Sequence, residues 1–384
     1  MLKNYMKTAW RTIIANRFFS ILNISGLAIG ICVSLFLFAF IRQELSFDTM
    51  YSKADNIYRV YMKLSAAYNE EKMLTLPNAV GPALKADIAQ VDNMVRVVKD
   101  GYGATASLRT DNENFSEKQL YLADSSLFSL FDFQFIEGNA HTAFSNKKSI
   151  VLSQSSKEKL FGKQEAVGKI ITINQRDTVQ VTGVFKDFPA NSTLDCNMVM
   201  NIMDSWMGKD VYWTNASYET YILLKKGADP GSIAQEATKL IDKYVEKDNQ
   251  YYTQFFLQPL SKVHLYSSDL TRGVTTRSGN INNIKTLSAL AFLVIMIACI
   301  NYMNLATAKS QKNAKQVGVN KVLGATRRQL IIRFFVETAT ISFFAMLIGV
   351  ILAIILIPVF NFFGKTDITL QHLLHWDMLG ILAL

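Results

Sequence analysis

The feature that most constrains this chain is a set of three long runs without a charged residue, at 18–41, 286–308 and 338–363. The runs contain 24, 23 and 26 residues. As helices they would be about 35 to 39 Å long, and the hydrocarbon core of a bilayer is about 30 Å thick. A buried helix of a soluble protein rarely stays uncharged for that long. The sequence therefore predicts three membrane-spanning helices.

A fourth apolar run starts at Met378 and reaches the last residue, Leu384. Seven residues are too few to cross a bilayer, so we expect 378–384 to be the start of a truncated fourth helix. The first run could instead be a signal peptide. Its apolar part exceeds the usual length of about 7 to 15 residues, and Arg42-Gln43-Glu44 offers no small-residue cleavage site. We therefore expect 18–41 to remain as an anchor.

Basic residues predict the orientation of these helices. Segments 1–17 and 309–333 hold four and seven Lys or Arg residues and no acidic residue. Such flanks mark the cytoplasmic side, so 42–284 is expected outside the membrane, with 364–377 as a short outer loop. Removing these 11 residues from the 40 basic ones leaves 29 against 31 acidic residues. The net charge of +9 is thus a topology signal, and it does not support nucleic-acid binding.

The N-terminal segment 1–17 has an amphipathic pattern, with apolar residues three and four apart and basic residues between them. We expect a helix that lies on the inner leaflet with its bases at the lipid headgroups. A simple topology signal is the alternative.

Two further features of the spans indicate contacts between helices. Gly26 and Gly30 are four residues apart, a spacing that lets a neighbouring helix approach closely. Asn301 and Asn304, together with Asn23, are the main polar side chains inside the spans, and they suit hydrogen bonds between helices.

The outer segment reads as two interleaved parts. Strand, helix and strand patterns follow one another at 57–64, 79–89 and 94–98, and again at 218–224, 233–245 and 255–260. Between them, 100–215 is rich in short strands and has short helices, one of them near 155–161. We predict an α/β subdomain formed by 42–99 and 216–284, with a β-rich subdomain of 100–215 inserted into it.

The sequence contains no recognisable active site. Gly364-Lys365-Thr366 resembles the end of a phosphate-binding loop, but the first glycine of that motif is replaced by Val359. His372 and His375 are three residues apart, and an interfacial role beside Trp376 is favoured over metal binding. We expect no catalytic residue, no metal site and no cofactor in this chain.

The segment between the second and third spans, which we expect on the inner side of the membrane, is the remaining candidate for a functional site. Residues 315–330 (KQVGVNKVLGATRRQL) are basic and carry two glycines. Gly324 fits a tight turn, and Thr326 fits the N-cap of the following helix. The segment is either an ordinary positively charged loop or a rigid hook that docks into a cytoplasmic partner.

The chain resembles the MacB/FtsX-type permease subunits of ABC transporters, over essentially its whole length. The stretches that carry the resemblance are Met1–Arg11, Asn23–Gly30, Glu44–Asp48, Ala54–Val60, Phe128–Phe135, Val151–Ser153, Leu160–Gly162, Gly183–Pro189, Ala298–Leu305 and Lys321–Ala325.

The resemblance implies an α-helical membrane protein with a large α+β extracytoplasmic domain, which has porter-like and inserted sabre-like parts. It also implies a permease in the bacterial inner membrane that transmits motion from a separate cytoplasmic ATPase dimer, where ATP and Mg²⁺ bind, to the outer domain. The residues expected to couple to the ATPase are Lys315, Gln316, Val317, Gly318, Lys321, Gly324, Ala325, Arg327 and Arg328; those expected to pack helices are Gly26, Gly30, Asn301 and Asn304.

The sequence departs from the family pattern at three places. Gln316 and Asn320 stand where the family usually has Glu and Arg, and Thr193 stands where a His is common. The segment thus loses one charge of each sign, and we expect no ion pair from positions 316 and 320 at the ATPase contact.

The expected work is export or extraction of a peptide, drug or lipoprotein. Activation of an extracytoplasmic enzyme and a membrane-anchored sensor are the alternatives. Besides the ATPase and membrane lipid, the expected partners are a second permease half or a second copy, and a periplasmic or outer-membrane protein.

Overall fold

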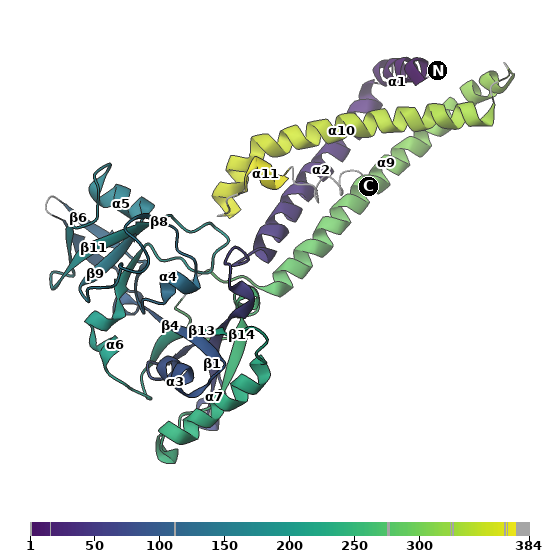
Figure 1. Cartoon of the computed structure of the whole chain (residues 1–384). Coiled ribbons are helices and arrows are strands. Elements are labelled where there is room, and N and C mark those ends of the chain that lie inside the picture. Colours follow the sequence, from purple (N-terminus) through teal and green to yellow (C-terminus); the bar gives the residue numbers. More distant parts are fainter. Residues whose placement is uncertain are drawn as a thin grey trace. The chain divides into compact units, whose positions relative to one another are not determined.

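The computed structural model describes residues 2–15, 17–110, 113–274, 277–322, 324, 326–364, 366 and 368–373. The chain forms two compact units: one contains 1–45 and 282–384, and the other is Ser46–Ile281. We call them the membrane unit and the outer unit. Figure 1 shows their elements.

The membrane unit is helical. Its helices are α1 (Leu2–Ala15), α2 (Arg17–Leu45), α9 (Ile281–Val322), α10 (Arg327–Gly364) and α11 (Leu370–Leu373). Among the described residues, three helices are long and apolar enough to cross a membrane, at Arg17–Leu45, Ile281–Asn304 and Arg327–Gly364. These coincide with the three predicted spans. The predicted fourth span, 378–384, lies outside the described residues.

The helices are longer than the uncharged runs. The sequence predicted a cytoplasmic loop over 309–333, but α9 continues to Val322 and α10 begins at Arg327. Residues 309–322 contain no proline, and their four Lys and two Gln residues are good helix formers, so the helix continues beyond the apolar part. Charged residues mark where the membrane-spanning part ends, but the helix itself can continue past them. The predicted loop is therefore two helix ends joined by a short turn.

Helix α1 packs on α10, where the rings of Trp10 and Phe344 lie 5.6 Å apart. Trp10 remains half exposed. The placement of 1–17 at the lipid surface stays a prediction.

The outer unit is built on one mixed sheet of 14 strands. The strands are β1 (Ile57–Leu64), β2 (Lys72–Met73), β3 (Thr75–Pro77), β4 (Val91–Lys99), β5 (Ala106–Arg109), β6 (Asn114–Glu117), β7 (Leu120–Ala123), β8 (Phe135–Glu137), β9 (Ser149–Ser153), β10 (Ile170–Ile173), β11 (Asp177–Phe185), β12 (Met198–Asn201), β13 (Ala216–Leu224) and β14 (Tyr252–Pro259). Its α-helices are α3 (Val80–Asp87), α4 (Leu127–Leu130), α5 (Gln154–Phe161), α6 (Trp206–Lys209), α7 (Pro230–Tyr244) and α8 (Leu260–Val263).

The order of the strands shows how the two predicted parts meet. The main path runs β14-β1-β13-β4-β7-β12-β9-β11-β10-β5-β6. Strands from 42–99 and 216–284 are neighbours, and so are those from 100–215. The two groups are not separate sheets, however, because β4 pairs with β7 in antiparallel register from Val97↔Ala123 to Lys99↔Tyr121.

Helix α7 shows why this part of the chain folds as it does. Asp229 caps the helix by accepting hydrogen bonds from the backbone N–H groups of Gly231 and Ser232, and Pro230 occupies the first turn. Its buried residues Ile233, Ala237, Leu240 and Ile241 recur at helical spacing and pack on the β1, β13 and β14 side of the sheet (Figure 1). The amphipathic pattern of the sequence thus becomes a helix-on-sheet core.

Candidate functional site

The turn between α9 and α10 is closed by a capping box. The backbone N–H of Gln329 donates to Thr326 Oγ1 at 3.4 Å, and Gln329 Oε1 accepts from the backbone N–H of Thr326 at 2.9 Å. Such reciprocal bonds satisfy N–H groups that a helix start leaves free. Gly324 has a φ of +90°, a left-handed value that favours glycine. The structure therefore has the tight, capped turn that Gly324 and Thr326 predicted.

The structure gathers most of the predicted coupling residues around this turn. Residues 315–318 and Lys321 lie on the last two turns of α9, and Arg327 and Arg328 open α10 with exposed side chains. Gly324 stands between the two helices, and Ala325 lies outside the described residues.

Sequence reasoning missed the apolar part of this surface. Exposed apolar side chains flank the turn: Val319, Val322, Ile331 and Phe335 are 52%, 88%, 58% and 72% exposed. The available signal was the occurrence of apolar residues within an otherwise basic segment. Together with Arg327 and Arg328 they define what we call the turn surface.

The predicted packing glycines face α9. A Cβ atom on Gly26 would lie 2.9 Å from Asn301 Nδ2, and one on Gly30 would lie 2.8 Å from the Cβ of Ala298. Such separations are too short for a real side chain, so α2 and α9 approach closely because these positions are glycine. Asn304, the other predicted packing residue, is exposed.

A second close contact, between α2 and α10, was not predicted. A Cβ on Gly349 would lie 2.9 Å from the carbonyl oxygen of Ala28. Ile341, Ala345 and Ala353 are also buried on α10, so the contact follows a four-residue spacing of mostly small residues. That spacing was visible in the sequence.

Gly349→Ile should separate α2 from α10, because its side chain would collide with Ala28 and Ile31. Cys32 on α2 is 5% exposed and belongs to the apolar cluster that includes Ala353. In the detergent-solubilised chain we expect a maleimide to react with Cys32 about tenfold faster in the variant. Peptide mass spectrometry would measure this rate. The exposed Cys299 is the internal reference, and Leu347→Ile, at an exposed α10 position, is the control. Equal Cys32 reactivity in both variants would contradict the packing argument.

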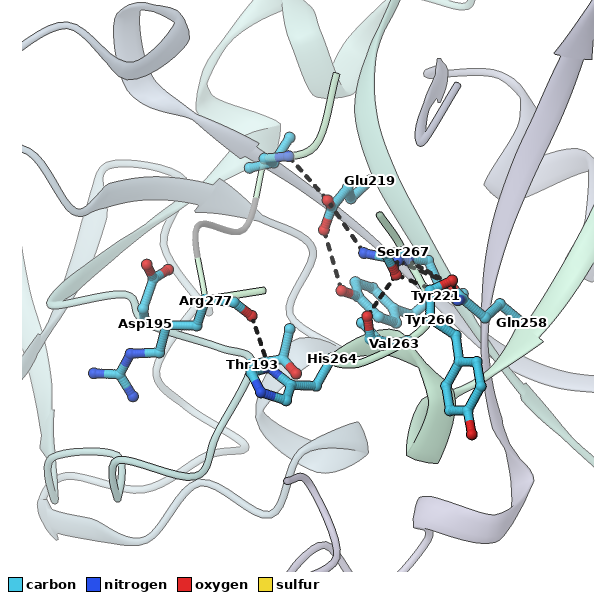
Figure 2. A network of polar contacts seen from close by, with 12 residues as sticks. Thr193, Asp195, Glu219, Tyr221, Gln258, Val263, His264, Tyr266, Ser267 and Arg277 are labelled. Carbon is cyan, nitrogen blue, oxygen red and sulfur yellow. Dashed lines mark hydrogen bonds and ion pairs between the residues drawn. The ribbon is translucent and has the colours of Figure 1, made fainter. Parts of the chain in front are cut away.

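Inside the outer unit, a buried ion pair ties two strands to the segment that precedes α9. Arg59 on β1 and Glu219 on β13 are 2% and 0% exposed, and Arg59 Nη1 lies 3.6 Å from Glu219 Oε1. Arg59 also donates to Gln258 Oε1 at 2.8 Å and to Ser267 Oγ at 2.5 Å. Figure 2 labels Glu219, Gln258 and Ser267 of this network.

The remaining acceptor positions of Glu219 are also used. The backbone N–H of Val274 donates to Oε1 at 2.9 Å, and the hydroxyl of Tyr221 donates to Oε2 at 3.1 Å. Burial and the charge of Glu219 raise the pKa of Tyr221 well above its ordinary value, so this hydroxyl stays a donor. Hydrogen bonds of this kind let a charged pair remain buried.

A neighbouring buried carboxylate lies three residues after the end of α2. Asp48 is 1% exposed and accepts hydrogen bonds from the backbone N–H and the hydroxyl of Thr193. Burial raises the pKa of Asp48, while the bonds from Thr193 and the nearby His264 and Arg59 act in the opposite direction. Thr193 therefore holds this carboxylate directly.

Neither network has the geometry of a catalytic site, because the side chains are closed off by one another. Among the residues that the structure describes, no group of three or more His, Cys, Asp or Glu side chains could hold a metal ion. The arrangement can anchor backbone segments.

Two domain families match the chain. Residues 20–240 match the MacB-like periplasmic core domain, and residues 288–384 match the FtsX-like permease C-terminal domain. Because the first match alone covers more than half of the chain, the chain belongs to the MacB/FtsX-type ABC transporter permeases. The chain is accordingly a permease, that is, a membrane protein with an extracytoplasmic domain.

Individual relatives are distant. The chain is 22% identical to the uncharacterized permease YknZ of Bacillus subtilis over 264 residues, 68% of this chain and 56% of that protein. It is 21% identical to the uncharacterized permease YvrN of the same organism over 355 residues, 90% of this chain and 85% of that protein. It is 22% identical to the macrolide export ATP-binding/permease protein MacB of Pasteurella multocida over 250 residues, 64% of this chain and 36% of that protein.

Proposed function

We propose that this permease transmits motion from a separate cytoplasmic ABC ATPase dimer to its extracytoplasmic domain. The observation that carries the proposal is the continuity of α9, a single helix of 42 residues from Ile281 to Val322. At about 1.5 Å per residue it is about 63 Å long, roughly twice the thickness of the hydrocarbon core. Ile281 is the last residue of the outer unit, and Val322 belongs to the turn surface. Helix α9 therefore runs without a break from the last residue of the outer unit to the turn surface.

The turn surface has the composition of a protein-docking site. Exposed apolar side chains supply contact area, and Arg327 and Arg328 supply charge for acidic groups of the ATPase. The family pattern would add Glu and Arg at positions 316 and 320, but this chain has Gln316 and Asn320. We therefore propose that recognition here depends on the two arginines and the apolar residues.

In this proposal the N-terminus and the turn are cytoplasmic, the membrane is the bacterial inner membrane and the outer unit is periplasmic. The chain itself is not catalytic, and ATP and Mg²⁺ act in the ATPase. A second permease half or a second copy completes the membrane part. The work done outside is export or extraction of a peptide, drug or lipoprotein; support comes from the relative named for macrolide export.

The proposal predicts that the tagged full chain, purified from its native membrane, brings down an ABC ATPase subunit. Reversing the charges with Arg327→Glu and Arg328→Glu should lower the recovered ATPase about tenfold or more, because like charges at a docking surface repel. Quantitative mass spectrometry of the eluate and ATP hydrolysis in it are the measurements.

The matched control reverses one exposed basic residue of the outer unit, Arg109→Glu, which should leave ATPase recovery unchanged. Absence of an ATPase from the wild-type preparation would contradict the proposed function. Unchanged recovery with the arginine variant would contradict only the role of the turn surface.

A further inference from the structure

The loop between β11 and β12 fastens the chain where it enters the outer unit from α2. Asn191 accepts from the backbone N–H of Asp48 at 2.9 Å through its carbonyl oxygen. Its side-chain Nδ2 donates to the carbonyl and hydroxyl oxygens of Ser46, at 3.2 and 3.0 Å. Thr193 binds the carboxylate of Asp48, and Ser192 Oγ lies 2.7 Å from the hydroxyl of Tyr51. We call 189–193 the clasp loop and 46–51 the entry segment.

The same loop fastens the chain where it leaves for α9. Arg277 Nη1 donates to the carbonyl oxygens of Pro189 and Ser192, at 3.0 and 3.3 Å. The carbonyl oxygen of Arg277 lies 3.2 Å from His264 Nδ1, a contact drawn in Figure 2. We call 264–281, within its described residues, the exit segment.

Backbone hydrogen bonds hold the exit segment as far as Ile281, the first residue of α9. The backbone N–H groups of Gly279 and Ile281 donate to the carbonyl oxygens of His264 and Leu265, at 2.9 and 3.0 Å. The rings of Phe47 and His264 also stack, with centroids 3.3 Å apart, so the entry and exit segments touch directly.

The bonds between Thr193 and Asp48 and between Ser192 and Tyr51 are buried, those from Asn191 to Ser46 and from Arg277 to Ser192 are partly buried, and the one from Arg277 to Pro189 is exposed. Ser192, Thr193, Asp48 and His264 are between 0% and 4% exposed. Hydrogen bonds in such surroundings are costly to leave unpaired, so the segments are expected to move together with the loop. Asp48 also has a φ of +59°, a left-handed value that is uncommon for a non-glycine residue, although Asp adopts it more readily than most.

We infer that the clasp loop is the link through which motion of α2 and α9 reaches the inserted subdomain, and that Asn191, Thr193 and Arg277 are its positioning residues. The loop is continuous with β11 and β12, two strands of the 100–215 part. The network of Arg59 and Glu219 instead anchors the exit segment to β1 and β13. The inference rests on the proposed function for the source of the motion, but the linkage itself needs no ATPase.

Hydrogen exchange of the full chain in nanodiscs, without ATPase, tests this linkage. Coupling between two sites is reciprocal, so each segment should respond to a change at the other. Arg277→Gln, on the exit side, should speed exchange at the amides of Asp48 and Thr193. Asn191→Ala, on the entry side, should speed exchange at the amides of Gly279 and Ile281. We expect about 5- to 30-fold in each case, the effect of losing one or two hydrogen bonds.

Arg176→Gln, at an exposed turn of the same unit, is the control and should change none of these amides. Amides of β9 report global unfolding. If these β9 amides also exchange faster in Asn191→Ala, that variant is replaced by the milder Thr193→Val, in which a methyl group takes the place of the hydroxyl. Faster exchange confined to the mutated side would overturn the inference, whether or not an ATPase binds the permease. A reciprocal response with no ATPase bound to the wild type would support the clasp and contradict the proposed function alone.

Discussion

Replacing Arg59 by methionine should lower the free energy of unfolding of the outer unit by about 3 to 5 kcal/mol, the usual cost of removing one partner of a buried ion pair. Methionine keeps much of the side-chain volume but leaves Glu219, which is 0% exposed, without its cation. It also removes the hydrogen bonds to Gln258 and Ser267. Pulse proteolysis of the solubilised full chain in increasing urea, read at cleavage sites within 46–281, would measure the change.

Lys63→Met is the matched control, because Lys63 lies on the same strand and pairs with Glu70 at 2.6 Å on the surface. An exposed pair contributes about 0 to 1 kcal/mol, so this variant should unfold close to the wild-type urea concentration. Adding Glu219→Gln to Arg59→Met removes the stranded charge and should recover part of the lost stability. Equal effects of Arg59→Met and Lys63→Met would show that the buried pair does not hold the outer unit together.

The sequence predicted the elements of this protein better than their limits. Uncharged runs are decisive for membrane spans, since a charge inside the bilayer is costly. The same criterion placed the end of the second span at 308, whereas α9 continues to Val322. Hydropathy indicates where the membrane-spanning part ends, whereas helix propensity indicates where the helix itself ends. In the sequence, only Gly324 and Thr326 indicated the turn that separates α9 from α10.

Tertiary pairing limited the prediction of the outer unit. The strand at Ile57–Leu64 was predicted with its exact limits, because β-branched and aromatic residues occupy it densely. The pairing of β4 with β7, which makes one sheet of two predicted parts, depends on register between strands and has no local signal.

The clasp contacts were beyond sequence reasoning for the same reason. Asp48 and Thr193 are 145 residues apart, and Arg277 lies 85 residues from Ser192. The sequence singled out the stretch after Pro189 only through its family resemblance. What Thr193 binds became visible only in the fold.

For the ATPase partner that we propose, Gly324→Val should abolish most of the stimulation of ATP hydrolysis that we expect from the permease, a loss of about tenfold or more. Valine at a φ of +90° is strained, because its branched Cβ clashes with the backbone in the left-handed region. Among the residues that the structure describes, no other atom lies within 4 Å of the position that a Cβ would occupy, so the cost falls on the backbone of the turn and not on packing. The turn would have to open, which would misalign the ends of α9 and α10 and with them the turn surface. ATP hydrolysis by the co-purified complex in nanodiscs, compared with the wild type, is the measurement.

Gly318→Val is the matched control, because it makes the same substitution near the end of α9. Among the described side chains, none lies within 4 Å of the position that a Cβ would occupy at Gly318 either, but Gly318 is helical and has no positive φ. Valine has a higher helix propensity than glycine, so the helix should be unharmed and ATPase stimulation should remain within about twofold of the wild type. Normal exchange protection of the outer unit in both variants would show that any loss arises at the turn. If Gly324→Val kept full stimulation, the geometry of the turn would not be needed for coupling, because a strained or opened turn would then serve as well as the native one.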